Sequence, residues 1–233
     1  MKIVLSGYGK MGREIESILL KSNHIIVARS ESITQIEKSL AADSVCIDFT
    51  TPEAFRDNYK FIAQNFKSAI IGTTGWDDIK SDVISCFTDN NCTMIYGSNF
   101  SVGVNILFKL CGIASNLCAD MGDYDPYILE MHHKFKLDSP SGTAKSIRDI
   151  VLKESGKDVA IESVRCGMIP GIHRLGFESA QDRITIEHEA FSRKGFAQRA
   201  VKAAEWSEMF NGVYDFRDII ESNINKILNN ERD

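Results

Sequence analysis

The strongest constraint on the fold is a glycine-rich turn that follows the first apolar run of the chain. Residues 2–6 read Lys-Ile-Val-Leu-Ser, and residues 7–12 read Gly-Tyr-Gly-Lys-Met-Gly, which matches G-x-G-x-x-G. Ile15, Ile18 and Leu19 then recur at helical spacing, so the glycines join a predicted strand to a predicted amphipathic helix. In this context the pattern is typical of a dinucleotide-binding turn, with the pyrophosphate at the helix N-terminus. The alternative is a tight turn without a ligand.

The rest of the first hundred residues alternates between short apolar runs and helical patterns. The apolar runs are rich in Ile and Val and cover residues 25–28, 45–49, 69–72 and 94–97. Helical patterns separate them, one opened by Thr51 as N-cap with Pro52 in the first turn. Strands that alternate with helices predict an α/β fold with a parallel sheet and right-handed crossovers.

The pattern changes after about residue 103, which predicts a second domain. A helix over 104–118 precedes a strand over 127–133 and a helix that begins near Ser141. Three extended segments follow, near 160–166, 172–178 and 182–190, and the last alternates apolar and polar residues. We expect an α+β domain with a mixed or antiparallel sheet, and two closing helices near 195–210 and 216–229.

Composition excludes several classes of protein. Hydrophobic residues make up 43% of the chain and charged residues 25%, and 27 basic against 32 acidic residues give a net charge of −5. These values are ordinary for a globular protein, and a mildly acidic chain without a basic block argues against general binding to nucleic acid or to an anionic membrane. Any anion must therefore bind in a local pocket.

The cysteine pattern and the apolar runs predict a cytoplasmic protein. Six cysteines occur without a C-x-x-C pair, so we expect reduced, buried thiols and not a zinc or redox site. The first apolar run is too short for a signal peptide, and we expect no stretch that approaches the roughly 18 apolar residues of a membrane helix.

The residues after the second predicted strand leave the coenzyme preference open. Arg29 could bind a 2′-phosphate and favour NADPH, whereas Glu31 could bond a ribose hydroxyl and favour NADH. Either side chain could instead be solvated. We therefore expect NADH or NADPH, with no preference assigned.

Two further loops follow strands of the predicted parallel sheet. Thr50-Thr51-Pro52-Glu53 follows the third strand, and Gly72-Thr73-Thr74-Gly75 follows the fourth. Ligands bind at the carboxyl edge of such sheets. Small and hydroxyl-bearing residues at this edge would let the ring or the carboxylate of a ligand come close to the backbone. Each loop alone is also consistent with turn and capping chemistry.

Residues 130–145 concentrate polar groups at the end of a predicted strand. His132 and His133 lie on opposite faces of an extended chain, so they do not ligate one metal together, and we predict no metal site. A histidine is an acid or base near neutral pH, and a lysine such as Lys136 holds an anion. Ser141 and Thr143 begin a helix whose free N–H groups favour a carboxylate.

The simpler interpretation of this segment is N-capping beside a solvated strand end. The density of cationic and donor groups favours a substrate site, with Arg193 as a further anion partner or a surface charge. From spacing alone, structural roles are expected for His173 and His188.

These segments together resemble one family, the 4-hydroxy-tetrahydrodipicolinate (dihydrodipicolinate) reductases. The resemblance runs nearly end to end and is most specific in the string EMHHKFKLDSPSGTA at 130–144. It also covers GYGKMG, DFTTPE (48–53), GTTGW (72–76), SNFSVGVN (98–105), RCGMIPGIH (165–173) and residues 184–206. The chain departs from the commoner family pattern at Ile172 and Arg174, and its glycine-rich loop is one residue shorter than that of many members.

The resemblance implies a fold, a reaction and an assembly. The fold is an N-terminal Rossmann-like domain, formed by 1–103 and 209–233, plus a substrate-binding and oligomerisation domain over 104–208 with a mixed open sheet. The reaction is NAD(P)H-dependent reduction of a cyclic imine, formed when 4-hydroxy-tetrahydrodipicolinate loses water, in lysine and diaminopimelate biosynthesis. A homotetramer that binds a small dicarboxylate substrate is expected.

The pattern and the resemblance together give a set of candidate site residues. His132 and Lys136 are the expected catalytic residues. Expected substrate contacts are His133, Ser141, Gly142, Thr143, Thr74 and Arg193. Expected coenzyme contacts are Gly7, Tyr8, Gly9, Lys10, Met11, Gly12, Arg29, Ser30, Phe49, Thr50, Gly72, Thr73, Thr74, Gly97, Ser98, Asn99 and Phe100.

The sequence is also compatible with two competing hypotheses. One is a two-domain nicotinamide oxidoreductase that acts on another amino or keto acid, and the other is a nucleotide-sensing protein without catalysis. Paired proton donors argue against a sensor, because sensing requires none.

Overall fold

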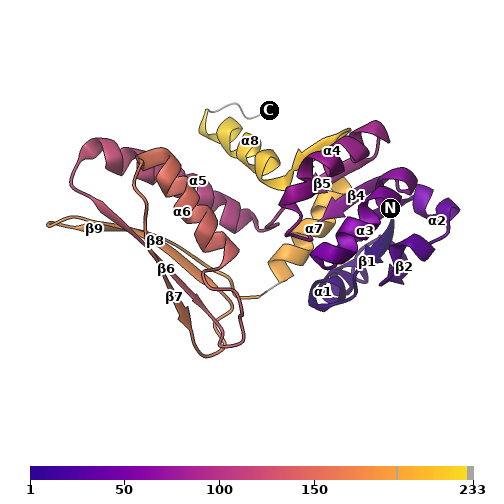
Figure 1. Cartoon of the computed structure of the whole chain (residues 1–233), viewed down its shortest axis with the longest axis horizontal. Helices are drawn as coiled ribbons and strands as arrows, with labels where there is room; N and C mark the ends of the chain where they lie inside the picture. Colours follow the sequence, from indigo (N-terminus) through magenta and orange to yellow (C-terminus); the bar gives the residue numbers. More distant parts are fainter. Residues whose placement is uncertain (193, 230–233) are drawn as a thin grey trace. The chain divides into compact units, whose positions relative to one another are not determined.

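The computed structural model describes residues 1–192 and 194–229, which form two compact units (Figure 1). The first unit contains Met1–Ser101 and the segment after Ser192, and the second contains Val102–Ser192. The predicted fold class is confirmed, with one parallel sheet and one mixed sheet.

The first unit is built on a six-stranded parallel sheet in the order β10-β5-β4-β3-β1-β2. Its strands are β1 (Lys2–Ser6), β2 (Ile25–Ser30), β3 (Ser44–Asp48), β4 (Ser68–Ile71), β5 (Thr93–Tyr96) and β10 (Val213–Asp215). Every residue of β3 and β4 is buried, as expected for central strands covered on both faces. The sequence did not predict β10, whose three residues are too short for a recognisable pattern.

Helices cover this sheet in pairs, with α1 against α7 and α3 against α4. Their bounds are α1 (Lys10–Leu19), α2 (Lys38–Ala42), α3 (Pro52–Asn65), α4 (Lys80–Asp89), α7 (Lys194–Trp206) and α8 (Phe216–Leu228), with short 3-10 turns at Ile33–Gln35 and Asp77–Ile79. The Thr51 side chain caps α3 by accepting from Ala54 N, and Pro52 occupies the first turn as predicted. A core centred on Phe55, Phe87 and Trp76 fills the interior.

The second unit places two helices on one face of a four-stranded mixed sheet (Figure 1). The strand order is β7-β6-β8-β9, with β6 and β7 parallel and the other pairs antiparallel. The elements are α5 (Val102–Met121), β6 (Asp125–His132), α6 (Gly142–Ser155), β7 (Ile161–Arg165), β8 (Ile172–Glu178) and β9 (Arg183–Glu189). Ile128, Glu130 and His132 are buried while Tyr127, Leu129 and Met131 are half-buried, because alternate β6 residues face opposite sides.

The sequence placed the second domain boundary at residue 209, whereas the units of the structure divide after Ser192. The helix α7 packs against α1 and against β3 and β4, so it belongs to the first unit. Helical periodicity shows that α7 has a buried face but not which element covers it.

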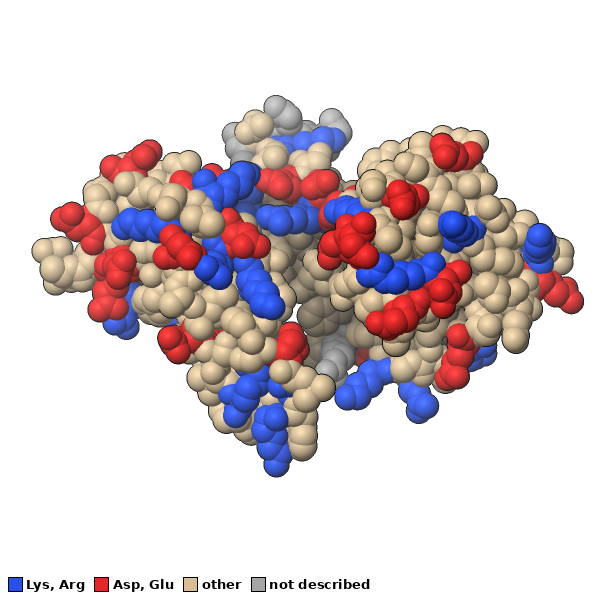
Figure 2. Space-filling view, in the orientation of Figure 1, with Lys and Arg blue, Asp and Glu red and all other residues tan. Residues whose placement is uncertain are grey.

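The helix α5 is long and apolar enough to span a membrane by length and composition alone. This is weak evidence for a membrane helix, because Leu107, Phe108 and Cys111 on its buried side contribute to the core of the second unit. Acidic and basic side chains intermingle over the visible surface of both units (Figure 2).

Candidate active site

The glycine-rich turn at residues 7–12 is shaped by two close backbone approaches. Gly7 has a φ of +85°, and a Cβ atom there would lie 2.4 Å from the carbonyl oxygen of Phe49. A Cβ atom at Gly12 would lie 2.3 Å from the Gly7 carbonyl oxygen, so only glycine lets α1 approach the turn this closely.

The same turn leaves an open anion-binding position. Gly9 caps α1, and a Cβ atom there would meet no atom within 4 Å. Lys10 and Met11 follow in the first turn, which carries no acidic residue. Open space over a helix N-terminus without a competing carboxylate fits a pyrophosphate group.

A buried carboxylate organises the loops beside this turn. Asp48 ends β3, is fully buried, and accepts hydrogen bonds from Ser6 Oγ (2.6 Å), Thr73 Oγ1 (2.5 Å) and Thr50 Oγ1 (3.0 Å). The Thr50 N–H also donates to Thr73 Oγ1 at 2.8 Å. Burial raises the pKa of Asp48, against the lowering effect of these hydrogen bonds. The loops after β1, β3 and β4 are thereby held together.

Aromatic rings complete this carboxyl edge of the sheet. A Cβ atom at Gly72 would lie 2.1 Å from the Phe49 ring, and the Phe49 and Phe100 ring centroids lie 6.1 Å apart. Phe100 in turn packs on Phe216, with centroids 4.8 Å apart, and Gly97 lies against the same pair. The predicted coenzyme residues that follow four different strands therefore converge.

The remaining predicted coenzyme residues lie along the same edge. Ser30 ends β2, and its carbonyl oxygen accepts from the Gly7 N–H at 2.9 Å. Arg29 pairs with Glu16 of α1, which the sequence analysis did not single out. Thr74 and Ser98 are exposed, and the Asn99 side chain accepts from Ser101 N.

In the second unit, the predicted catalytic residue His132 lies beside a buried glutamate. Glu130 and His132 share one face of β6, and Glu130 Oε2 contacts His132 Nδ1. The other oxygen, Oε1, accepts from Arg165 Nη2 at 2.6 Å and from Ser141 N at 3.3 Å. Burial raises the pKa of Glu130, but the hydrogen bonds, first from Arg165, lower it overall.

The opposite nitrogen of His132 faces a glycine. A Cβ atom at Gly171 would lie 3.0 Å from His132 Nε2, so glycine keeps space in front of that nitrogen. Burial lowers the pKa of His132, while Glu130 acts to raise it and Lys136 acts to lower it.

The residues that open α6 are bound to His173, for which spacing alone had suggested a structural role. Ser141 caps the helix by accepting from Ala144 N (3.3 Å), and its Oγ lies 2.9 Å from His173 Nε2. The His132 and His173 ring centroids are 5.1 Å apart. Burial and the neighbouring His132 lower the pKa of His173 to about 4.

The other predicted site residues lie on the segment between β6 and α6. Lys136 Nζ donates to Asp138 Oδ1 at 2.7 Å. The backbone N–H of Lys136 donates to the His133 carbonyl oxygen at 3.1 Å. The buried Nδ1 of His133 has no hydrogen-bond partner among the described residues. Gly142 and Thr143 form the first turn of α6. Arg193 lies outside the described residues.

Glu130, His132 and His173 bring potential metal-ligand atoms within 4.8 Å of one another. The Glu130 carboxylate already accepts from the Arg165 guanidinium, and this positive charge opposes a cation. We therefore interpret the group as a hydrogen-bonded network.

Glu130 and Arg165 join the candidate site through their hydrogen bonds, although neither was predicted from the sequence. The RCGMIPGIH segment contributes three residues near His132. Arg165 bonds to Glu130, Gly171 faces His132 Nε2, and the His173 ring lies against the His132 ring. The signal for Glu130 was an acidic residue at an apolar position of β6, two residues before His132 and hence on the same face.

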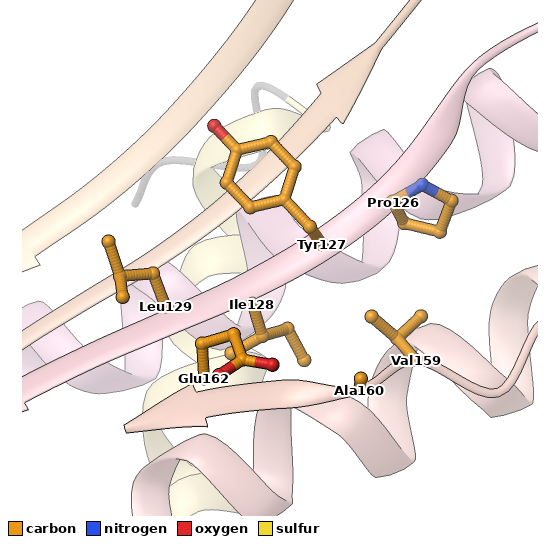
Figure 3. A pocket seen from close by; sticks show the side chains of 7 residues that line it. All are labelled: Pro126, Tyr127, Ile128, Leu129, Val159, Ala160 and Glu162. Carbon is orange, nitrogen blue, oxygen red and sulfur yellow. The ribbon is translucent and has the colours of Figure 1, made fainter. Parts of the chain in front are cut away.

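A separate cavity of about 390 Å³ lies along β6 and β7, between Tyr127, Leu129 and Glu162 (Figure 3). It adjoins the first half of β6, whereas His132 ends that strand. The cavity is mostly apolar, and the carboxylate of Glu162 in its lining would repel a dicarboxylate.

Comparison with protein families gives two matches that together cover most of the chain. The N-terminal region of dihydrodipicolinate reductase matches residues 1–100, and its C-terminal region matches residues 103–220.

Individual proteins agree with this result. The 4-hydroxy-tetrahydrodipicolinate reductase of Christiangramia forsetii is 36% identical over 236 residues, covering 94% of this chain and 98% of that protein. A dipicolinate-bound dihydrodipicolinate reductase from Paenisporosarcina sp. TG-14 has a similar fold, with a TM-score of 0.76 at 21% identity, covering 94% of this chain and 99% of that one.

Proposed function

The chain belongs to the dihydrodipicolinate reductase family, and on this premise we propose how its residues perform the reaction. It is an NAD(P)H-dependent enzyme of lysine and diaminopimelate biosynthesis. The reaction converts 4-hydroxy-tetrahydrodipicolinate to tetrahydrodipicolinate with loss of water. The chain must therefore bind a dinucleotide and a dicarboxylate, and must provide a proton.

The first unit holds the dinucleotide in this proposal. Gly9 and the N-terminus of α1 receive the pyrophosphate, because the open position there offers free N–H groups. The edge formed by Phe49, Gly72 and Phe100 receives the nicotinamide ring, which supplies the hydride when the coenzyme is bound.

The N-terminus of α6 receives a substrate carboxylate. His173 is neutral at pH 7, and we assign its proton to Nε2, so that Ser141 Oγ accepts from both His173 and Ala144 N. The hydroxyl proton of Ser141 is then left to donate to the carboxylate. Gly142 and Thr143 add the free N–H groups of the first turn. His133, which directly follows His132, is a further proposed contact to the substrate.

Thr74 and Arg193 are further proposed contacts to the substrate. Thr74 is exposed directly after Thr73, which is buried and bonded to Asp48.

His132 and Lys136 provide the proton and the positive charge. Reduction of the imine leaves electron density that must be protonated, and an imidazole can donate a proton near neutral pH. Glu130 accepts from Nδ1–H, so the proton that the ring gains when it becomes charged lies on Nε2 and points toward the space beside Gly171. This arrangement of Glu130, His132 and Arg165 is the observation that carries the mechanism.

The substrate is a dianion, and its binding raises the pKa of His132. In the free protein burial keeps that pKa below its ordinary value. Two carboxylates beside the ring favour the protonated form, so the proton donor becomes charged when substrate is present.

We also infer a homotetramer in the cytoplasm, assembled through the open face of the mixed sheet. Tyr127, Leu129 and Met131 of β6 face away from the helices, and Val164 of β7 lies on the same face. The cavity of Figure 3 opens beside these side chains. Leu129→Glu should lower the mass measured by light scattering, whereas Lys153→Glu, at an exposed side chain of α6, should not. An unchanged mass for Leu129→Glu would contradict this assembly.

The reaction is tested by the loss of reduced-nicotinamide absorbance. Substrate is generated in situ from pyruvate and aspartate semialdehyde by its synthase, and NADH and NADPH are used separately. Oxidation that requires the complete mixture supports the reductase activity. A folded protein that binds coenzyme but gives no oxidation would refute it.

Variants then test the proton donors. His132→Ala and Lys136→Ala should lower kcat by about 100-fold or more while coenzyme affinity is kept. Lys134→Ala is a matched control, since its ammonium group lies over the Phe135 ring. Full turnover by both catalytic variants would show that the proton comes from another group.

A further inference from the structure

Three side chains from different elements form a cluster at the end of β2. Glu16 of α1 accepts from the Tyr8 hydroxyl through Oε2, and from Nε of Arg29 through Oε1. The Arg29 Nη2 atom contacts the same Oε1. The Glu16 side chain is 16% exposed, so this carboxylate is held and partly shielded.

The position of this cluster relates it to the coenzyme. In β1 and β2, Leu5 pairs with Arg29 and Ser6 with Ser30, and the Gly7 N–H donates to the Ser30 carbonyl oxygen. The cluster therefore adjoins the glycine-rich turn. In dinucleotide-binding folds this end of the second strand receives the adenosine ribose, and its 2′ group distinguishes NADPH from NADH.

The negative charge of Glu16 disfavours a 2′-phosphate at Arg29. Arg29 is the cation at this strand end, but its Nε and Nη2 donors are directed to Glu16. A phosphate placed at Arg29 would bring about two negative charges next to the Glu16 carboxylate. A 2′-hydroxyl is neutral and can donate to a carboxylate, so it meets no such repulsion.

A second cation, Arg13, lies close enough to act on the same carboxylate. The Arg13 guanidinium lies over the Tyr8 ring, 5.5 Å from its centroid. Hydrogen bonding from Tyr8, then from Arg29, lowers the pKa of Glu16, so the carboxylate stays ionised.

We propose that Glu16 is a selectivity residue that disfavours NADPH relative to NADH by engaging Arg29. The inference rests on the proposed function, because it assumes that the first unit binds a nicotinamide dinucleotide.

The test compares Glu16→Gln with Glu14→Gln, a substitution of the same charge on the same helix. Dissociation constants of the intact protein for NADH and NADPH are measured by titration calorimetry. In Glu16→Gln the ratio of the NADPH to the NADH constant should fall about tenfold, as expected when one like charge is removed beside a dianion. Glu16→Lys should lower the ratio further, and Glu14→Gln should keep the wild-type ratio.

The outcomes separate this inference from the proposed function. An unchanged ratio in both Glu16 variants, or an equal fall in Glu14→Gln, would overturn the inference while the reductase activity stands. A wild-type protein that binds neither dinucleotide would overturn both. Thermal unfolding of each variant confirms that the compared proteins are folded.

Discussion

Acidification should destabilise the second unit through His173. The unfolded chain binds a proton at this imidazole below its ordinary pKa of 6.5, whereas the folded protein does so only below about 4. Between these values the unfolded state holds one more proton, so stability falls as pH falls. The stabilisation is fully present above pH 6.5 and is lost progressively toward pH 4.

The size of this effect follows from the shift. The pKa falls from 6.5 to about 4, and at about 1.4 kcal/mol per pH unit this gives about 3.5 kcal/mol in full, of which about 3 kcal/mol is lost by pH 4. His173 is 6% exposed, so solvent screens the effect little.

Native-state hydrogen exchange of β8 amides measures the local opening free energy without assuming that both units unfold together. Between about pH 7 and pH 4, the opening free energy of the β8 amides should fall by about 3 kcal/mol more in the wild-type protein than in His173→Gln. The glutamine keeps a polar group near Ser141 but does not titrate. Equal losses in the two proteins would show that His173 is not the group responsible.

Four substitutions test other parts of the site. Glu130→Gln should lower kcat about 10- to 100-fold, and the fall of kcat/KM with rising pH should begin at lower pH, because the carboxylate raises the pKa of His132. A merely structural Glu130 would leave the pH profile unchanged. Gly12→Ala should lower stability by about 1–3 kcal/mol, since its Cβ would lie 2.3 Å from a backbone oxygen. Gly9→Ala should keep the melting temperature and weaken coenzyme binding. A lower melting temperature for Gly9→Ala with unchanged coenzyme binding would contradict the roles assigned to the two glycines. Asp48→Asn should destabilise the first unit by about 2 kcal/mol in thermal unfolding, because an amide group places donors where acceptors are needed. An unchanged melting temperature would argue against this role.

Local patterns predicted the parts of the fold that depend on neighbouring residues. The strand, glycine-rich turn and helix over residues 2–19 follow from spacing alone, and so does the Ser141 cap of α6. The resemblance of the 130–144 segment supplied the family. Elements whose place depends on distant contacts were not predicted, such as β10 beside β5 and α7 in the first unit.

The partners of His132 show why the site could be predicted only in part. Arg165 lies beside it because β7 pairs with β6 in a register that sets His132 opposite Arg165, and its guanidinium then bonds to Glu130. His173 reaches it because β8 pairs with β6 in a register that sets Glu130 opposite His173. Alternation of apolar and polar residues restricts each strand to one face, but it leaves the pairing register to the whole sheet.

Each unit uses a fully buried carboxylate to position its candidate site. Asp48 joins the loops after β1, β3 and β4, and Glu130 joins β6, β7 and the start of α6. Burying an acid in an apolar strand is costly unless several donors satisfy its oxygens. Since those donors come from different segments, the cost is offset only when the loops are correctly placed. The carboxylate thus couples the stability of each unit to the geometry of its site, so an acidic residue in an otherwise apolar strand is a useful sequence signal for functional loops.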